Sequence, residues 1–417
     1  MTKQLQAVSA ILLSVLVFLM GTGLLNTIIP VRANLDGFSN FTIGLIGSAY
    51  YVGFVAGCYA GPHLLARVGH SRTFAVAAGL AAACTLALSL FMSELSWILL
   101  RGLFGVGAAC LYMVVESWLN DRATNETRGR VFASYMVVNY VGIVLGQWLF
   151  VTARPSSFSL FSISAMAFAI CLIPIGLTRT PQPTRTEVPS LNPLKIFRAS
   201  PVGVAGCIAV GFANAAVWTF APIYAEDIGM TRGLLAGFMI AFTLGGAIVQ
   251  IPVGRLSDRM DRRYVIAGVC LLAAIGGICL YLFGGHNRWL TLGLIGLFGM
   301  LSLPVYGLSV AHSNDRLPRT MFVEASATLL MINALASVAG PIVAAMVTAR
   351  AGIASLFLYT ATIHIAMFAF TLIRLGAKSA PADETREPFE PMPEQASPMS
   401  VELDPRGPEQ VVQTAPL

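Results

Sequence analysis

The stretch GRLSDRMDRR, residues 254–263, is a short and strongly charged loop between two long apolar segments. A degenerate copy, PHLLARVGHSR, occupies residues 62–72, which is 192 residues earlier. At this offset Arg67 aligns with Arg259. A charged loop that recurs in two apolar halves predicts a membrane protein built by duplication, and it argues against an enzyme.

The composition predicts an all-α membrane protein. Of the 417 residues, 56% are hydrophobic and only 11% are charged, whereas soluble domains carry about 25% charged residues. Apolar stretches of about 20 residues recur, each long enough to cross a bilayer as a helix, which satisfies its own backbone. We predict twelve transmembrane helices, at 7–29, 42–61, 73–93, 97–119, 131–151, 157–177, 202–224, 234–253, 264–284, 289–311, 322–348 and 353–374.

The predicted spans divide into two pseudo-symmetric six-helix bundles, residues 1–177 and 201–375. A polar, cationic segment, residues 178–200, joins them as a cytoplasmic linker. Residues 376–417 are rich in proline and acidic side chains, with eight carboxylates between Asp383 and Glu409. Such a composition buries too little apolar surface to order itself. We therefore predict a disordered cytoplasmic tail.

The distribution of Lys and Arg orients the chain. With the N-terminus inside, 20 of these 26 cations fall on cytoplasmic segments, 5 fall outside, and Arg101 lies within a span. This asymmetry predicts that both termini are cytoplasmic. It also accounts for the basic composition without a nucleic-acid partner. We expect a bacterial inner-membrane protein that functions as a monomer within the lipid bilayer.

Two motifs resemble those of the major facilitator superfamily. Residues 254–263 match its loop signature G-x-x-x-D-R-x-G-R-R, with Asp261 in place of the second glycine. Residues 101–109 match R-x-x-x-G-x-G-A-A. The stretches VVESWLNDRATNETRGR and SYMVVNYVGIVLGQ are similar to the YcaD-like branch of bacterial facilitators. This resemblance covers residues 5–375 and implies two bundles that move a small solute by alternating access, but it does not specify the cargo.

Arg101 is the foremost candidate site residue. A charge at bilayer depth is costly, so it indicates a function unless it is paired or wetted. The matching arginine of facilitators is associated with proton coupling or substrate contact, which the resemblance implies here. The alternative is an arginine that snorkels to the outer headgroups.

Glu116, near the inner end of the same span, has two interpretations. It either carries protons or forms a cytoplasmic latch with nearby cations. We assign the cytoplasmic gate to charged residues of both halves, with Asp258 also a candidate cap for the following helix. The gate residues are Arg67, Arg72, Glu116, Arg128, Asp258, Arg259, Arg262 and Arg263.

Polar and aromatic residues of the spans form the predicted substrate site. Asn139 and Asn333 occupy equivalent positions of the two halves, where an amide can bind a neutral polar cargo or join two helices. The complete substrate-binding set is Asn26, Arg101, Tyr112, Asn139, Asn214, Trp218, Tyr306 and Asn333. Gly146-Gln147 stands where facilitator antiporters carry glycine-proline, which argues against antiport.

The sequence lacks motifs for ATP-driven transport and for metal-dependent catalysis. It contains no Walker motif for ATP and no clustered metal ligands, so we expect no cofactor and no metal. The first span has no acidic residue, which favours a neutral or anionic cargo over a lipophilic cation. We predict a proton-coupled secondary transporter. A drug or lipid exporter, and a non-transporting sensor or scaffold, are the alternatives.

Overall fold

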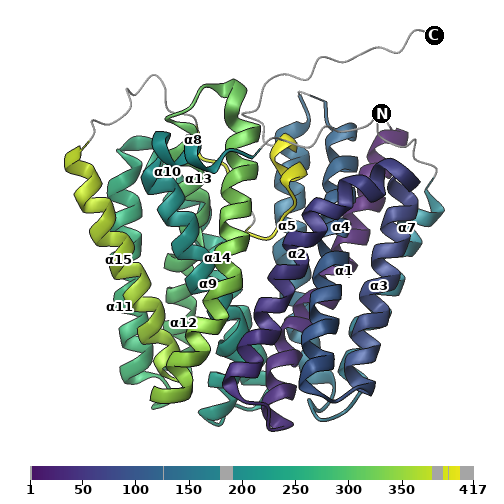
Figure 1. Ribbon diagram of the computed structural model, residues 1–417, viewed down its shortest axis with the longest axis horizontal. Helices are drawn as coiled ribbons and strands as arrows, with labels where there is room; N and C mark the ends of the chain where they lie inside the picture. The colour runs from purple at the N-terminus through teal and green to yellow at the C-terminus, as the bar shows by residue number, and fades with distance from the viewer. Residues whose placement is uncertain (1, 125, 179–190, 378–387, 393, 404–417) are drawn as a thin grey trace.

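The computed structural model describes residues 2–124, 126–178, 191–377, 388–392 and 394–403. Twelve helices within these ranges are long and apolar enough to span a bilayer, which confirms the predicted number. The protein is a multi-pass membrane protein. The helix α1 (Thr2–Leu35) begins and α15 (Ser355–Ala377) ends on one side of the bundle (Figure 1). We call this side the terminal face and the other side the opposite face.

The first half consists of α1, α2 (Asn40–Val68), α3 (His70–Leu90), α4 (Glu94–Arg122), α5 (Arg128–Leu149), α6 (Ser159–Ile170) and α7 (Leu172–Leu177). The helix α8 (Pro193–Ala199) lies in the predicted linker. The second half consists of α9 (Pro201–Asp227), α10 (Arg232–Arg259), α11 (Arg262–Phe283), α12 (Arg288–Ser302), α13 (Pro304–Asn314), α14 (Phe322–Ala351) and α15. Short 3-10 turns are η1 (Phe150–Thr152), η2 (Arg319–Met321) and η4 (Pro398–Leu403).

The first helix does not end near Pro30, as the sequence suggested, but continues to Leu35. Proline lacks an amide hydrogen and frees the carbonyl four residues earlier, which a packed bundle tolerates. Pro30 thus frees the carbonyl of Asn26. In the second half, Pro222 lies inside α9 and frees that of Trp218. Both freed carbonyls belong to residues that line the central cavity.

The internal duplication is visible in the turns at the opposite face. Gly37 and Gly229 both adopt positive φ angles, of 81° and 74°. The side chains of Ser39 and Thr231 then cap α2 and α10, and each accepts a hydrogen bond from the backbone amide three residues further on. Each pair of residues is 192 positions apart, the offset that the charged loops predict. The local chemistry of the turn is therefore repeated along with the helices.

The two halves meet near the opposite face, where α2 packs on α14, α1 on α9 and α5 on α10. A Cβ atom added to Gly44 would lie 2.7 Å from the carbonyl oxygen of Pro341, so α2 and α14 touch through their backbones. Nearby, Asn34 Nδ2 donates to Glu226 Oε2 over 3.1 Å. The conformation is closed on this face.

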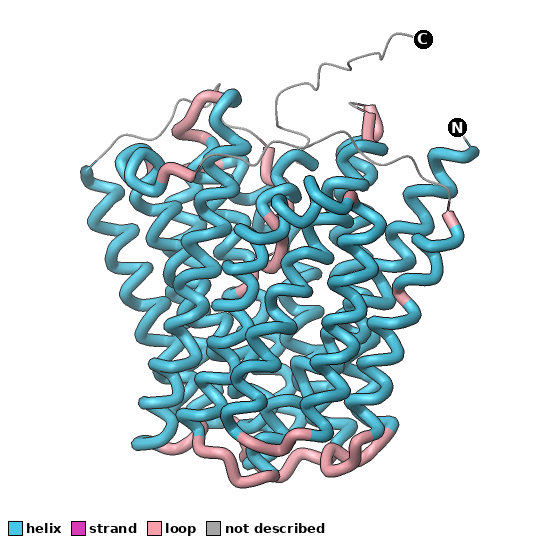
Figure 2. The backbone as a smooth tube through the Cα atoms, turned by 45° about the vertical axis from the view of Figure 1, so that its right-hand side comes forward, coloured by secondary structure: helices cyan, strands magenta, loops and turns pink. Residues whose placement is uncertain are grey.

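On the terminal face, part of the C-terminal tail enters between the halves (Figures 1 and 2). Here the structure differs from the predicted disorder, because Ala396, Ser397 and Met399 are at most 1% exposed. The acidic average of the tail conceals a local run of small and apolar residues that can be buried. Residues 378–387, 393 and 404–417 of the predicted disordered segment lie outside the described residues.

Candidate functional site

A cavity lies between the two halves and is bounded on the terminal side by the tail. Its walls come from α1, α4 and α5 of the first half, from α9 and α10 of the second, and from tail residues Met392, Glu394 and Gln395. The space left beside the tail is about 80 Å³. Such a volume holds a few water molecules, and a metabolite does not fit while the tail is present.

Four of the predicted substrate-binding residues line this cavity: Asn26, Tyr112, Asn139 and Trp218. Arg101 lines an adjoining cavity, to which Asn26 and Trp218 also contribute. The structure therefore brings these five together between the halves. Asn214 and Asn333 contact the tail instead. Tyr306 is buried in α13 and borders neither cavity.

Arg101 is only 6% exposed and points into the bundle. Its Nη2 donates to Asn26 Oδ1 over 2.5 Å, and its Cζ lies 4.5 Å from the centre of the Tyr50 ring. The second terminal nitrogen, Nη1, is buried without a hydrogen-bond partner. Among the described residues no carboxylate pairs with Arg101. A buried cation with a free donor is suited to an anionic or strongly polar group, and this geometry is not that of an arginine snorkelling to lipid.

Glu116 is fully buried in α4. Its Oε1 accepts a hydrogen bond from the Tyr135 hydroxyl over 2.8 Å. Its Oε2 accepts from the backbone amide of Ser397, over 2.9 Å, and from the Ser397 hydroxyl, over 2.5 Å. In this conformation Glu116 therefore contacts an aromatic hydroxyl and the tail, and it forms no ion pair within the described chain.

The paired asparagines do not occupy equivalent environments. Asn139 Nδ2 donates to the carbonyl of Tyr135 in its own helix, over 2.9 Å. Asn333 Nδ2 donates to the backbone carbonyl of Glu394 in the tail, over 3.3 Å. Both side chains are buried, but their amides bond different partners. The first is held by its helix, and the second reaches across to the tail.

The predicted gate residues do not form a single cluster. Arg67, Arg72 and Arg259 are exposed, and the described residues pair none of them with a carboxylate. Arg128 is 4% exposed at the start of α5. In this conformation, the gate assignment stays a prediction for these four residues.

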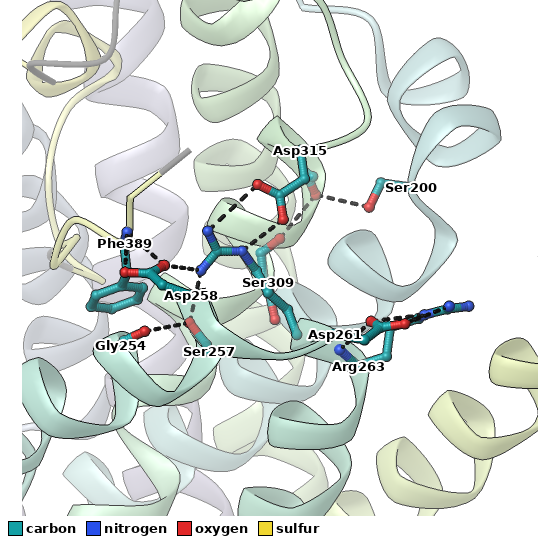
Figure 3. A network of polar contacts seen from close by, with 11 residues as sticks. Ser200, Gly254, Ser257, Asp258, Asp261, Arg263, Ser309, Asp315 and Phe389 are labelled. Carbon is teal, nitrogen blue, oxygen red and sulfur yellow. Dashed lines mark hydrogen bonds and ion pairs between the residues drawn. The ribbon is translucent and has the colours of Figure 1, made fainter. Parts of the chain in front are cut away.

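Buried ion pairs instead gather at the loop between α10 and α11 (Figure 3). Arg262 is 1% exposed and pairs with Asp258 over 2.9 Å and with Asp315 over 2.7 Å. Asp315 lies directly after α13, so these pairs connect the ends of α10, α11 and α13 in the second half. Each of these contacts lies within one half.

Asp261, rather than Asp258, caps α11. Its side chain accepts from the backbone amide of Arg263 over 3.0 Å and pairs with the guanidinium over 2.6 Å. Burial pushes the pKa of Asp261 upward, but the hydrogen bonds from Arg263 outweigh it and hold the pKa below its ordinary value. Asp261 stands where the family signature has a glycine, and its structural role at this position is to cap α11.

Several cavity residues were not predicted from the sequence. Gln147 Nε2 donates to Thr243 Oγ1 over 3.0 Å, and Gln250 bonds the Tyr140 hydroxyl. Both pairs join α5 to α10 across the two halves. The signal was the presence of glutamine inside an apolar span, since such a group needs a partner in lipid. These four residues and Thr22 supply further polar atoms to the cavity.

This arrangement of two six-helix halves around a polar cavity has known relatives. The family model described as Major Facilitator Superfamily matches residues 11–242 and 233–406. The chain belongs to the major facilitator superfamily. Its homologues and its fold are those of transporters, not of enzymes.

Among curated relatives, the "uncharacterized MFS-type transporter" Ent638_1421 of Enterobacter sp. (strain 638) is 27% identical over 385 residues, which are 91% of this chain and 99% of that protein. The "uncharacterized MFS-type transporter YcaD" of Escherichia coli K12 is 25% identical over 386 residues, with the same shares. The resemblance to YcaD-like proteins is thereby confirmed.

Solved structures share the fold at low sequence identity. The nucleoside transporter NupG superposes with a TM-score of 0.72 at 13% identity, covering 91% of this chain and 100% of NupG. A D-xylose-proton symporter superposes with a TM-score of 0.71 at 16% identity, covering 90% of this chain and 98% of the symporter. These similarities establish the twelve-helix facilitator fold.

Proposed function

We propose that the protein is a proton-coupled secondary transporter that moves a small neutral or anionic solute across the bacterial inner membrane. The two halves would expose the cavity to each face in turn, and the terminal face would be cytoplasmic. The observation that carries this proposal is the buried Arg101, which has a free donor and, in the part of the chain that the structure describes, no carboxylate partner. It lies beside a cavity lined by amides and hydroxyls.

The relatives support a solute of moderate polarity. NupG and the xylose-proton symporter are named for nucleoside and sugar transport, and both cargo classes present hydroxyl groups to amides. The cavity of this protein has the corresponding donors and acceptors in Asn26, Gln147 and Gln250. Arg101 adds a positive charge that favours a carboxylate or phosphate on the cargo. We assign one monomer as the transporting unit.

One observation favours the exporter alternative. A second, larger groove between α5 and α10 is lined mainly by apolar side chains, among them Phe132, Val137 and Leu244. Val137 is 61% exposed on the surface that would face lipid. An apolar compound would enter such a groove from the bilayer, whereas a polar metabolite would not. This second candidate is an exporter of lipids or apolar drugs.

A thermal-shift screen of the purified protein distinguishes the candidates. A solute that binds only the folded state raises the melting temperature, by an amount equivalent to about 2.7 kcal/mol at 100 times its Kd. Small acids, sugars and nucleosides should stabilise the protein, and the best of them should enter proteoliposomes. Stabilisation by lipids or apolar drugs alone would select the exporter. Failure of every solute to cross the membrane would contradict transport.

Proton coupling makes a prediction at Glu116. We expect Glu116→Gln to abolish accumulation of the solute driven by a pH gradient, because the amide cannot bind and release a proton. Counterflow exchange without a gradient should persist. The two modes are measured in the same proteoliposomes.

Tyr135→Phe is the matched control, since it removes a hydrogen bond to Glu116 but leaves the carboxyl group. This variant should still respond to the pH gradient. Gradient-driven accumulation in the glutamine variant at the wild-type level would show that Glu116 does not carry the proton.

A further inference from the structure

The first tail contact is made by the charged loop motif. The backbone amide of Phe389 donates to both carboxylate oxygens of Asp258, over 2.9 and 3.1 Å (Figure 3). The Phe389 ring lies against Gly254, where an added Cβ would come within 2.0 Å of it, and against Gly307, at 3.1 Å. Gly254 and Asp258 are the glycine and the aspartate of the loop signature. The loop motif thus forms a binding site for one aromatic residue of the tail, Phe389.

The tail continues inward with polar contacts to both halves. Glu394 Oε1 accepts from Asn214 Nδ2 over 2.7 Å, and Gln395 Oε1 accepts from the Tyr50 hydroxyl over 3.4 Å. Farther along, the amide and hydroxyl of Ser397 both donate to Glu116. These donors satisfy the fully buried carboxylate of Glu116, which pairs with no cation of the described segments. The contacts are specific, because each uses a side chain buried within a span.

The tail occupies the space that the two halves need in order to approach. It contacts Glu116 and Tyr50 in the first half, and Asp258, Asn214 and Asn333 in the second. The turn η4 packs on both α4 and α14. The terminal face therefore cannot close while the tail is bound. A ligand that binds only one of two conformations shifts the population toward it.

We propose that the mouth of the central cavity is a docking site for the chain's own residues 388–392 and 394–403, which act as a tethered inhibitor of the cargo site. The docked tail holds the terminal face open and leaves too little volume for a solute. Its effect on transport rests on the proposed function, whereas docking itself does not. Tethering raises the effective concentration of the segment to about the millimolar range, so weak intrinsic binding suffices.

The test releases the tail from an already folded protein. A protease recognition sequence replaces residues 379–385 in the full chain, and Met136→Cys places a thiol on the cavity wall. The rate of labelling with a polar maleimide is measured from the terminal side, before and after cleavage and washing. Cleavage should accelerate labelling about 100-fold, within the range that tethering contributes. The same chain without the added cysteine gives the background of the seven native cysteines.

A synthetic peptide of residues 388–403, added to the cleaved protein, should slow labelling again. The peptide with Phe389→Ala and Ser397→Ala should not, since it lacks the aromatic group and one donor to Glu116. Equal labelling before and after a complete cut would overturn docking. Once a solute is identified, equal transport before and after cleavage would overturn inhibition. Accelerated labelling without transport of any solute would contradict the proposed function and leave docking supported.

The docked tail also predicts a dependence on pH through Glu394. Burial raises the pKa of Glu394 to about 8, although the hydrogen bond from Asn214 lowers it in part, and the ordinary value is 4.5. The docked carboxyl thus binds a proton more tightly than the free one. Docking should be strongest below about pH 4.5, weaken as the pH rises, and level off above about pH 8.

Affinity of the labelled peptide for the cleaved protein, measured by anisotropy between pH 5 and 8.5, checks this slope. The titratable groups that face Glu394 are Tyr51, Tyr140, Cys207 and Tyr306, and their side-chain types ordinarily titrate above pH 8. The peptide with Glu394→Gln retains the titration of Glu116, so the difference between the peptides isolates Glu394. Identical slopes for both peptides would contradict its role.

Discussion

Replacement of Arg101 by alanine is expected to abolish transport while the protein still folds and reaches the membrane. The guanidinium lies beside the cavity, bonded to Asn26 and resting on Tyr50. Hydrogen bonds to a charged group each contribute about 1.5–3 kcal/mol, which corresponds to about 10- to 150-fold in affinity per bond. The alanine variant loses both terminal nitrogens. Its uptake rate at low solute concentration should therefore fall by about 150-fold or more.

Initial uptake rates in proteoliposomes and thermal shifts with the best solute measure this effect. Arg101→Lys should recover little, because a point charge does not reproduce the planar fork of donors. Arg288→Ala is the matched control, since that guanidinium lies 5.9 Å from the centre of the Trp289 ring at the start of α12, away from both cavities. Wild-type uptake by Arg101→Ala would exclude the residue from the cargo site.

The helical fold was predictable because the membrane leaves few alternatives. Backbone groups in lipid must bond within their own segment, so a long apolar run specifies a helix. The ends were less predictable, as Pro30 shows, because the loss of one backbone bond does not stop a helix that neighbours support. The duplication was predicted from the charged loops, and the structure repeats it at the turns, where Gly37 and Gly229 both adopt positive φ angles.

The site was only partly predictable, for a physical reason. A buried charge such as Arg101 can be recognised in the sequence, because placing a charged side chain in lipid costs free energy and therefore indicates a function. Pairing between distant segments carries no such signal. No residue pattern connects Ser397 with Glu116, or Phe389 with Asp258, although the structure brings them into contact. The acidic composition of the tail even suggested disorder, whereas its contacts depend on two backbone amides, one aromatic ring and the polar side chains of Glu394, Gln395 and Ser397.

The largest effect on stability is expected at Gly53. A Cβ atom at this position of α2 would lie 1.8 Å from the carbonyl oxygen of Gly102 in α4, far inside any van der Waals contact. Gly53→Ala must therefore push two packed backbones apart, and neither is a flexible side chain that can move aside. Overpacking typically lowers the free energy of unfolding by about 1–3 kcal/mol and occasionally by more. Because this backbone contact is so short, we expect Gly53→Ala to lose about 3 kcal/mol or more.

Gly79→Ala is the matched control, since it adds the same methyl group to a helix of the same half where nothing lies within 4 Å. Alanine also favours a helix over glycine by about 1 kcal/mol, so this variant should melt at or above the wild-type temperature. Melting in detergent, followed by size-exclusion chromatography, compares the two. If Gly53→Ala and Gly79→Ala melt at the same temperature, then the backbones of α2 and α4 are not in contact, and the packing of these two helices described above is incorrect.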